Sequence, residues 1–347
     1  MIKTSAYATP SPTSPLAPFT IDRREPGKHD VLIDILYCGV CHSDIHQARD
    51  EWGGAIYPMV PGHEIIGTIL RIGSEVSRWH IGDTVGVGCF VDSCRQCESC
   101  EAGEEQYCLH GASFTYNSRE QDGKTPTYGG YSTQITVDES YVVRIPAGIP
   151  LERAAPLLCA GITTYSPLRH FGVNRHDKIA IVGLGGLGHM AVKLGKALGA
   201  EVTVLSHSPN KRDDAIRLGA DNFIVTRDLE VFTQHAGRFS FILDTVSAQH
   251  DYNAYLSLLS RGGTMVLVGL PEPTPLSAWP LVMGGRRLAG SLIGGIRETQ
   301  EMLDFCAEHG IAADVEVIPI QKINDAYDRA LKNDVHYRFV IDVASLK

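Results

Sequence analysis

The stretch Lys178-Ile-Ala-Ile-Val182-Gly183-Leu-Gly185-Gly-Leu-Gly188 decides the fold of the second half of this chain. A short apolar run ending at Val182 is typical of a buried β-strand, and glycines follow it in the spacing G-x-G-x-x-G. Beyond them, apolar residues recur at helical spacing at Leu187, Met190, Ala191, Leu194 and Leu198. A strand, a glycine turn and a helix in this order predict a dinucleotide-binding unit.

Each glycine of this turn has a separate physical task. Gly183 permits the tight turn, Gly185 lets backbone amides approach a pyrophosphate, and Gly188 allows close packing of helix against strand. A plain glycine-rich turn would satisfy the same spacing. The position between a strand and a helix nevertheless favours cofactor binding, with five predicted contact residues: Gly183, Gly185, Gly186, Leu187 and Gly188.

The glycine turn lies within a longer alternation of strands and helices. After the first strand at Lys178–Val182, five more strands are predicted at Val202–Leu205, Asn222–Val225, Phe241–Asp244, Met265–Val268 and Leu288–Ser291. Six strands with helical crossovers predict a doubly wound parallel sheet, the Rossmann fold, over residues 161–295.

The residues after the second of these strands indicate which dinucleotide binds. An NAD site usually has Asp or Glu there, to accept hydrogen bonds from the ribose. This chain has hydroxyl, imidazole and basic groups instead, at Ser206, His207, Ser208, Lys211 and Arg212. Such groups would hydrogen-bond to a 2′-phosphate and neutralise it, so the sequence predicts NADP(H). A solvated loop is the alternative interpretation.

The first half of the chain has a different texture. Short β-like pieces separated by glycine and proline predict an antiparallel barrel or sandwich over residues 1–160. They are Val31–Leu36, Gly67–Gly73, Gly82–Gly88 and Tyr131–Val137. A helix at Glu298–His309 and a strand at Tyr337–Asp342 are expected to return to this domain, so residues 296–347 are assigned to it. The chain is therefore predicted to be α/β with two domains.

Composition limits the possible functions. The 347 residues are 44% hydrophobic and 20% charged, with a net charge of −9, so binding to nucleic acid through a basic surface is excluded. The N-terminus lacks the apolar segment of a signal peptide, no membrane span is visible, and prolines interrupt the residues that follow. Nine cysteines then indicate a reducing cytoplasm, where thiols bind metal. Cys38, Cys89 and Cys306 are expected to be ordinary buried residues.

Two sets of potential metal ligands lie in the first half. Cys94, Cys97, Cys100 and Cys108 are close in sequence and can enclose one structural zinc ion, although an iron–sulfur cluster is an alternative. Cys41, His63 and Cys159 are far apart and converge only if a domain folds around them. Three such ligands would leave the fourth position of a tetrahedral zinc ion open for catalysis.

Several motifs in their order carry a family resemblance that covers essentially the whole chain. They are Gly39-Val-Cys41-His42-Ser43-Asp44-Ile-His46, Pro61-Gly-His63-Glu64, the four-cysteine loop, Leu158-Cys159-Ala-Gly-Ile-Thr-Thr and Ser291-Leu-Ile-Gly-Gly. Together they resemble the zinc-dependent medium-chain alcohol dehydrogenases, within the medium-chain dehydrogenase/reductase group. The match is strongest to the cinnamyl-alcohol-dehydrogenase-like branch of NADPH-dependent aldehyde reductases. The resemblance implies a GroES-like β-barrel catalytic domain beside the Rossmann domain.

The resemblance also implies roles for individual residues. Ser43 would exchange a proton with the substrate oxygen, His46 would relay it to solvent, Asp44 would orient His63, and Glu64 would approach the zinc during ligand exchange. Contacts to the cofactor are implied for His42 and Thr163. An aromatic substrate pocket is implied for Trp52, Phe114 and Tyr116.

Three of these roles have plainer alternatives. Asp44 has the position of an ordinary acid at a helix start, His46 that of a helix cap, and Cys159 lies in an apolar context typical of a core. Only the resemblance favours the functional interpretation of Cys159.

The implied function is a zinc-dependent NADP(H) alcohol dehydrogenase or aldehyde reductase, an oxidoreductase acting on CH–OH donors. It would transfer hydride reversibly between NADPH and a zinc-bound aldehyde, aromatic aldehydes included, and possible substrates include ketones. Two zinc ions per chain and a cytoplasmic homodimer paired near Leu288–Ser291 are implied as well. A zinc-free quinone reductase would lack the dispersed ligands, and a non-catalytic NADPH-binding protein would show a degraded set of them.

Overall fold

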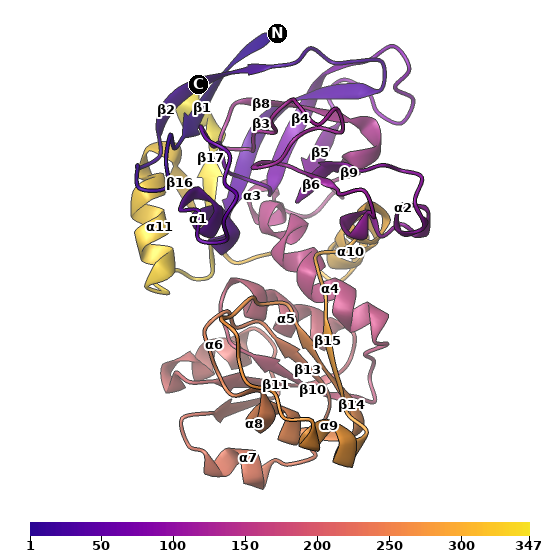
Figure 1. Cartoon of the computed structure of the whole chain (residues 1–347), viewed down its shortest axis with the longest axis vertical. Coiled ribbons are helices and arrows are strands. Elements are labelled where there is room, and N and C mark those ends of the chain that lie inside the picture. Colours follow the sequence, from indigo (N-terminus) through magenta and orange to yellow (C-terminus); the bar gives the residue numbers. More distant parts are fainter. The chain divides into compact units, whose positions relative to one another are not determined.

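The computed structural model describes all 347 residues, which form two compact units (Figure 1). Residues 1–162 and 294–347 form the first unit, and residues 163–293 form the second. The helix α4 (Ala160–His170) begins in the first unit and ends in the second. No helix combines the length and the apolar character that crossing a bilayer requires.

The second unit contains a six-stranded sheet in the order β12-β11-β10-β13-β14-β15, and every neighbouring pair is parallel. Its strands are β10 (Lys178–Val182), β11 (Glu201–Ser206), β12 (Asn222–Val225), β13 (Phe239–Asp244), β14 (Leu259–Leu267) and β15 (Arg287–Gly290). The order reverses between β10 and β13, where doubly wound sheets bind their ligands. The predicted doubly wound parallel sheet is confirmed.

Helices connect these strands, and the first of them buries its apolar face in the core of the unit. In α5 (Gly186–Ala197), Met190, Ala191 and Leu194 are fully buried, as their spacing predicts. The other helices of the unit are α6 (Arg212–Arg217), α7 (Glu230–Gln234), α8 (Tyr252–Ser257) and α9 (Trp279–Gly284).

The first unit contains a seven-stranded sheet in the order β16-β17-β3-β4-β5-β9, with β8 paired to β3. Its strands are β3 (Asp30–Val40), β4 (Ile65–Ile72), β5 (Thr84–Val87), β8 (Gln134–Asp138), β9 (Val143–Arg144), β16 (Val315–Pro319) and β17 (Arg338–Asp342). All pairs are antiparallel except β16 and β17, which are parallel. The sheet thus joins strands from both ends of the sequence, in accord with the expected GroES-like domain.

An N-terminal hairpin was not predicted. The strands β1 (Ile2–Ala8) and β2 (Ala17–Arg23) pair antiparallel, with Tyr7 opposite Pro18. A proline lacks the amide hydrogen that an inner strand must donate, but a two-stranded hairpin consists of edges and tolerates it. The proline-spaced N-terminus is therefore compatible with strands on both sides of a turn.

Smaller elements complete the first unit. A second hairpin pairs β6 (Phe90–Asp92) with β7 (Ser113–Phe114), and the helices are α1 (His42–Ala48), α2 (Glu98–Ala102), α3 (Leu151–Ala154), α10 (Ile296–Glu308) and α11 (Ile323–Leu331). Short 3₁₀ turns across the chain are Glu105–Tyr107, Glu139–Tyr141, Ala155–Leu158, Pro209–Lys211, Ile320–Lys322 and Val343–Leu346.

Candidate metal and cofactor sites

The dispersed ligand set converges within the first unit. Ligand atoms of Cys41, His63, Glu64 and Cys159 all lie within 4.8 Å of one another. Cys41 caps the start of α1, while His63 and Glu64 directly precede β4. Cys159 follows a 3₁₀ turn at the start of α4. Folding of the sheet therefore brings together residues that are more than a hundred positions apart.

The chemistry and spacing of these groups fit a zinc ion. The sulfur atoms of Cys41 and Cys159 are 3.9 Å apart. Two sulfurs at about 2.3 Å from a tetrahedral zinc would be separated by about 3.8 Å. Two thiols and an imidazole provide three such ligands. Glu64 adds a buried carboxylate oxygen, Oε2, that has no hydrogen-bond partner and therefore remains available as a ligand.

Asp44 makes the contacts that both of its predicted roles require. Its Oδ2 accepts a hydrogen bond from the amide of Cys41 at 2.8 Å, which caps α1. Its Oδ1 lies 3.1 Å from Nδ1 of His63 and accepts from the amide of Gly62 at 3.0 Å. One fully buried carboxylate thus fixes the position of Cys41 and the ring orientation of His63.

An ion pair beside the ligands was missed in the sequence. Arg338, at the start of β17, pairs with Glu64, and both side chains are almost completely buried. The Nη1 atom of Arg338 also lies 3.9 Å from the sulfur of Cys41. Burial raises the pKa of Glu64 to about 7, although the charge of Arg338 opposes this shift. In the sequence, the only indication of this ion pair was that a charged residue, Arg338, begins an apolar strand.

Cys89 is a second neighbour that sequence reasoning did not connect with the site. It is buried, as expected, and its sulfur lies 3.7 Å from the carbonyl oxygen of Leu158, next to Cys159. Cys38 and Cys306 are fully buried, also as expected. Nothing in the spacing of Cys89 distinguished it from these two.

The predicted proton-relay residues lie on α1. The hydroxyl of Ser43 is 3.6 Å from the sulfur of Cys41. His46 is one turn further along, and its Nδ1 is 2.5 Å from a carboxylate oxygen of Glu51. Its direct polar partner is thus Glu51 and not Ser43. The ring of His42 lies 6.4 Å from that of His46 and is exposed.

The three aromatic candidates divide into two groups. Trp52 and Phe114 line a cavity of about 340 Å³, together with Gln47, Asp50 and Asn117. As whole residues, Trp52 and Phe114 are 48% and 39% exposed, so both are accessible for apolar contact. Tyr116 is instead buried and stacks on the ring of His63 at 5.7 Å. It belongs to the wall of the metal site.

The four clustered cysteines also converge, with ligand atoms within 4.8 Å of one another. The sulfur of Cys100 is 3.9 Å from that of Cys94 and 3.5 Å from that of Cys97. These separations match tetrahedral coordination of a single ion. Backbone amides donate to Cys108 and Cys97, each at 3.4 Å, as they commonly do to thiolates. All nine cysteines of the chain are free.

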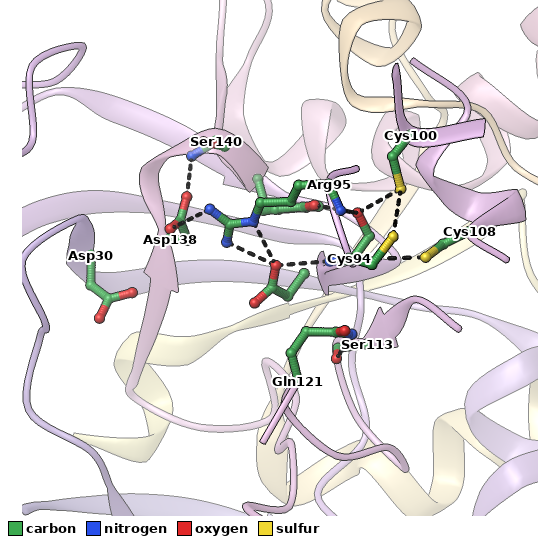
Figure 2. A network of polar contacts seen from close by, with 12 residues as sticks. Asp30, Cys94, Arg95, Cys100, Cys108, Ser113, Gln121, Asp138 and Ser140 are labelled. Atoms are coloured by element: carbon green, nitrogen blue, oxygen red, sulfur yellow. Dashed lines mark hydrogen bonds and ion pairs between the residues drawn. The ribbon is translucent and has the colours of Figure 1, made fainter. Parts of the chain in front are cut away.

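A polar network anchors this loop to the sheet (Figure 2). The guanidinium of Arg95 donates to Asp92 at 2.8 Å and to Asp138, the last residue of β8, at 2.9 Å. The hydroxyl of Ser93 lies 3.1 Å from the sulfur of Cys100 and 2.7 Å from the hydroxyl of Tyr141. The loop is therefore held by its own ligands and by a charged connection to the strand.

In the second unit, the glycine turn has the geometry that the sequence predicts. Gly183 has a φ of +88°, and a Cβ on Gly188 would lie 2.2 Å from the carbonyl oxygen of Gly183. A Cβ on Gly185, which caps α5, would meet no atom within 4 Å. The turn therefore requires glycine for its conformation and close packing, while the helix start remains open to an anion.

The loop after β11 places its polar residues beside this turn. Lys211 is half-buried, and its ammonium donates to the carbonyl oxygen of Leu184 at 2.8 Å. Burial lowers the pKa of Lys211. Ser206 accepts a hydrogen bond from the amide of Ser208 at 3.2 Å, while His207 is exposed and Arg212 lies over the ring of Phe223. Thr163 is buried in α4.

Comparison with known proteins identifies the family. The model of the alcohol dehydrogenase GroES-like domain matches residues 27–147, and that of the zinc-binding dehydrogenases matches residues 186–308. Over the full length of both chains, the sequence is 58% identical to NADP-dependent alcohol dehydrogenase C 1 of Mycolicibacterium smegmatis. The chain belongs to the zinc-dependent alcohol dehydrogenase family. The resemblance stated from its motifs is confirmed.

Two further members of this alcohol dehydrogenase family show its branch. The chain is 53% identical to the aldehyde reductase YahK of Escherichia coli, with 99% of each chain covered. A solved cinnamyl alcohol dehydrogenase of Sorghum bicolor is 46% identical, with a TM-score of 0.96 and coverage of 99% of this chain and 98% of that one. The chain is thus an oxidoreductase of the alcohol dehydrogenase type, as predicted.

Proposed function

We propose that the protein is an NADP(H)-dependent zinc alcohol dehydrogenase that acts mainly as an aldehyde reductase, with aromatic aldehydes among its substrates. The observation that carries this proposal is the convergence of Cys41, His63 and Cys159 beside the hydroxyl of Ser43. The names of the relatives support the cofactor and the substrate class. The test is a screen of aldehydes and ketones with NADPH, in which no turnover of any carbonyl compound would contradict the proposal.

The chain's own residues would act in defined ways. Bound zinc supplies a Lewis acid for a carbonyl, and bound NADPH supplies the hydride. Cys41, His63 and Cys159 hold the metal with one position open to substrate. The hydroxyl of Ser43 gives a proton to the substrate oxygen, and His46 returns a proton from solvent. In oxidation of an alcohol the same groups carry the proton outward.

Glu64 and Asp44 support this set without taking part in proton transfer. Asp44 keeps His63 in the tautomer that coordinates through its other nitrogen. Glu64 can approach the metal through its unpartnered oxygen when water and substrate exchange. Arg338 keeps a compensating charge beside two thiolates and a carboxylate, which limits the cost of burying them.

The proposal assigns a separate task to each region of the chain. Residues 1–160 and 296–347 would form the zinc-binding domain, and residues 161–295 the NADP-binding domain. We infer two zinc ions per chain, one catalytic and one structural in the four-cysteine loop. The structural ion would stabilise its loop and take no part in the reaction.

The proposed cofactor contacts are centred on the N-terminus of α5, which is open to an anion. Backbone amides from Gly185 to Gly188 would bind the pyrophosphate, and His42 and Thr163 would provide further contacts. The 2′-phosphate would be bound by Ser206, His207, Ser208, Lys211 and Arg212. The ammonium of Lys211 already lies beside the turn, 2.8 Å from the carbonyl of Leu184.

We expect a strong preference for NADPH that depends on this loop. A charge-assisted phosphate contact contributes about 1.5–3 kcal/mol, which corresponds to about 10- to 150-fold in kcat/KM. Changing Ser206→Asp together with Lys211→Ala should erode or reverse the preference. The control Lys196→Ala removes an exposed lysine that pairs with Asp221 in the same unit, and should leave the ratio unchanged. Equal kcat/KM for NADPH and NADH in the unaltered enzyme would refute the assignment.

We also infer a homodimer formed by pairing of β15 with its copy. This strand ends the sheet and pairs only with β14. The adjacent helix α9 exposes Trp279, Val282 and Met283, each by 66% or more. An unpaired edge next to exposed apolar side chains is a typical surface for association.

Solution mass provides the test of this dimer. Val282→Glu with Met283→Arg should convert the dimer into monomers in light scattering. Leu229→Glu is the matched control, because Leu229 is as exposed as Val282 but lies at the start of α7. A monomeric unaltered protein, or a dimer that tolerates both substitutions, would contradict this interface. A cytoplasmic location accompanies the proposal because a reducing compartment keeps ligand cysteines as thiols.

A further inference from the structure

The segment between β13 and α8 forms one wall of the glycine turn. The hydroxyl of Thr245 donates to the carbonyl oxygen of Val182 at 2.7 Å. A Cβ on Gly183 would lie 2.8 Å from a methyl carbon of Val246, and a Cβ on Gly269 would lie 2.5 Å from the carbonyl oxygen of Val246. Val246 is thus enclosed between two glycines. Any displacement of this residue must therefore change the turn that precedes α5.

One buried carboxylate determines the path of this segment. Asp244, the last residue of β13, is 1% exposed. Its Oδ1 accepts from the amide of Val246 at 3.1 Å, and its Oδ2 lies 2.7 Å from Nε2 of His250. The other ring nitrogen of His250, Nδ1, lies 2.8 Å from the carbonyl oxygen of Ala248. The side chain of His250 therefore closes residues 244–250 into a hydrogen-bonded ring.

The partners of His250 define its protonation state. A carboxylate and a backbone carbonyl only accept hydrogen bonds, so both ring nitrogens must carry a hydrogen for both contacts to form. A neutral imidazole has only one such hydrogen. The other groups facing the ring are the carboxylate of Asp251 and the edges of Tyr252 and Tyr255, at ring distances of 5.0 and 5.3 Å. The surroundings thus favour the imidazolium form.

We propose that His250 is a positioning residue whose imidazolium holds the wall of the glycine turn, so that cofactor affinity falls when His250 loses its proton. The inference rests on the proposed binding of NADP(H) in the second unit. It concerns the dinucleotide turn and not the 2′-phosphate loop, so NADPH and NADH should be affected to the same degree.

The direction of the pH effect follows from linkage. Burial opposes the charge of His250, but the hydrogen bond and charge of Asp244 outweigh it and raise the pKa above the ordinary value for histidine. The ring of bonds is therefore fully formed at pH values below that ordinary value. It is lost as the pH rises through the raised value. The dissociation constant for NADPH should rise by about fivefold or more over this range, a typical strength of coupling between sites.

The experiment compares three zinc-loaded proteins by fluorescence titration with NADPH and NADH between pH 6 and pH 9. In the unaltered enzyme, both dissociation constants should rise with pH. In the His250→Gln variant, the glutamine side chain can donate a hydrogen bond to Asp244 but carries no charge. The dissociation constants for NADPH and NADH should therefore be raised at low pH and should not depend on pH in this way. The control His235→Gln replaces another histidine of the same unit. Its two dissociation constants should change with pH as they do in the unaltered enzyme. The kcat at saturating NADPH should change little in all three.

The same pH profile in His250→Gln as in the unaltered enzyme would overturn the proposal. If the variant does not fold, the ¹⁵N chemical shifts of His250 in the unaltered enzyme test the proposal instead. A neutral His250 ring at pH 6.5 would also overturn the proposal. Failure of the unaltered enzyme to bind NADPH at any pH would refute the proposed function instead. In that case the ¹⁵N titration still reports whether His250 is charged.

Discussion

Replacing Cys159 with alanine should remove one of two zinc ions and nearly all activity. Without Cys159 the open site keeps Cys41 and His63, and Glu64, the other converged group, is already paired with Arg338, so too few ligands remain to retain the metal. Loss of a Lewis acid worth several kcal/mol corresponds to about 10³-fold or more in kcat/KM. Elemental analysis of the purified variant, together with its turnover of benzaldehyde, measures both effects.

The controls for this prediction lie next to the site and far from it. Cys89→Ala removes a thiol beside Leu158 that is not among the converged ligands, and Cys306→Ala removes one in α10. Both variants should keep two zinc ions and most of the activity. In the unaltered enzyme, a chelator should remove the three-ligand zinc and activity first, because four sulfurs, two of which accept hydrogen bonds from backbone amides, would hold the other ion. A Cys159→Ala enzyme that keeps two ions would show that Cys159 is not a ligand.

Ser43→Ala should reduce kcat by about 10²–10⁴-fold, the usual contribution of a positioned proton donor. Its hydroxyl lies 3.6 Å from the sulfur of Cys41. The zinc content should remain unchanged. Ser43→Thr is the matched control because it retains a hydroxyl, and it should recover much of the lost rate. Turnover of Ser43→Ala at the unaltered rate would leave protonation to water.

His46→Ala should cost less than Ser43→Ala. The ring of His46 is partly exposed and its polar partner is Glu51, so solvent can replace it as the last member of the relay. If His46 is the last member of the relay, the pH profile of kcat should change in His46→Ala while the zinc content stays the same. A larger loss from His46→Ala than from Ser43→Ala would reverse the proposed order of the two groups.

Local patterns in the sequence were sufficient to predict the six parallel strands of the second unit, although β14 begins at Leu259, six residues before its predicted start at Met265. Lys178–Val182 and Asn222–Val225 coincide with β10 and β12 because continuous apolar runs between glycines or helices leave few alternatives to a buried parallel strand. The turn at Gly183 was equally predictable, since its positive φ and the close approach of Gly188 are properties of single positions. The helix Glu298–His309 was predicted within two residues of α10 at its start.

Contacts between distant segments could not be predicted in this way. Arg338 and Glu64 meet because β17 pairs with β3 next to β4, and neither residue carries a local sign of its partner. The pairing of His250 with Asp244 spans only six residues, yet it depends on a loop path that no periodicity records. Asp44 shows why the alternatives for a residue need not exclude each other, because two oxygens allow a helix cap and a ligand contact at once.

The central place of β17 has a consequence for how the protein is made. Residues 338–342 leave the ribosome after every other strand of both sheets, yet they lie between β16 and β3 and bring Arg338 to Glu64. The nucleotide-binding unit, by contrast, is one uninterrupted segment from residue 163 to residue 293. A nascent chain therefore contains everything needed for that unit before it can complete the sheet around the metal ligands. The proposed catalytic metal can therefore reach its final environment only after the whole nucleotide-binding unit has been synthesised.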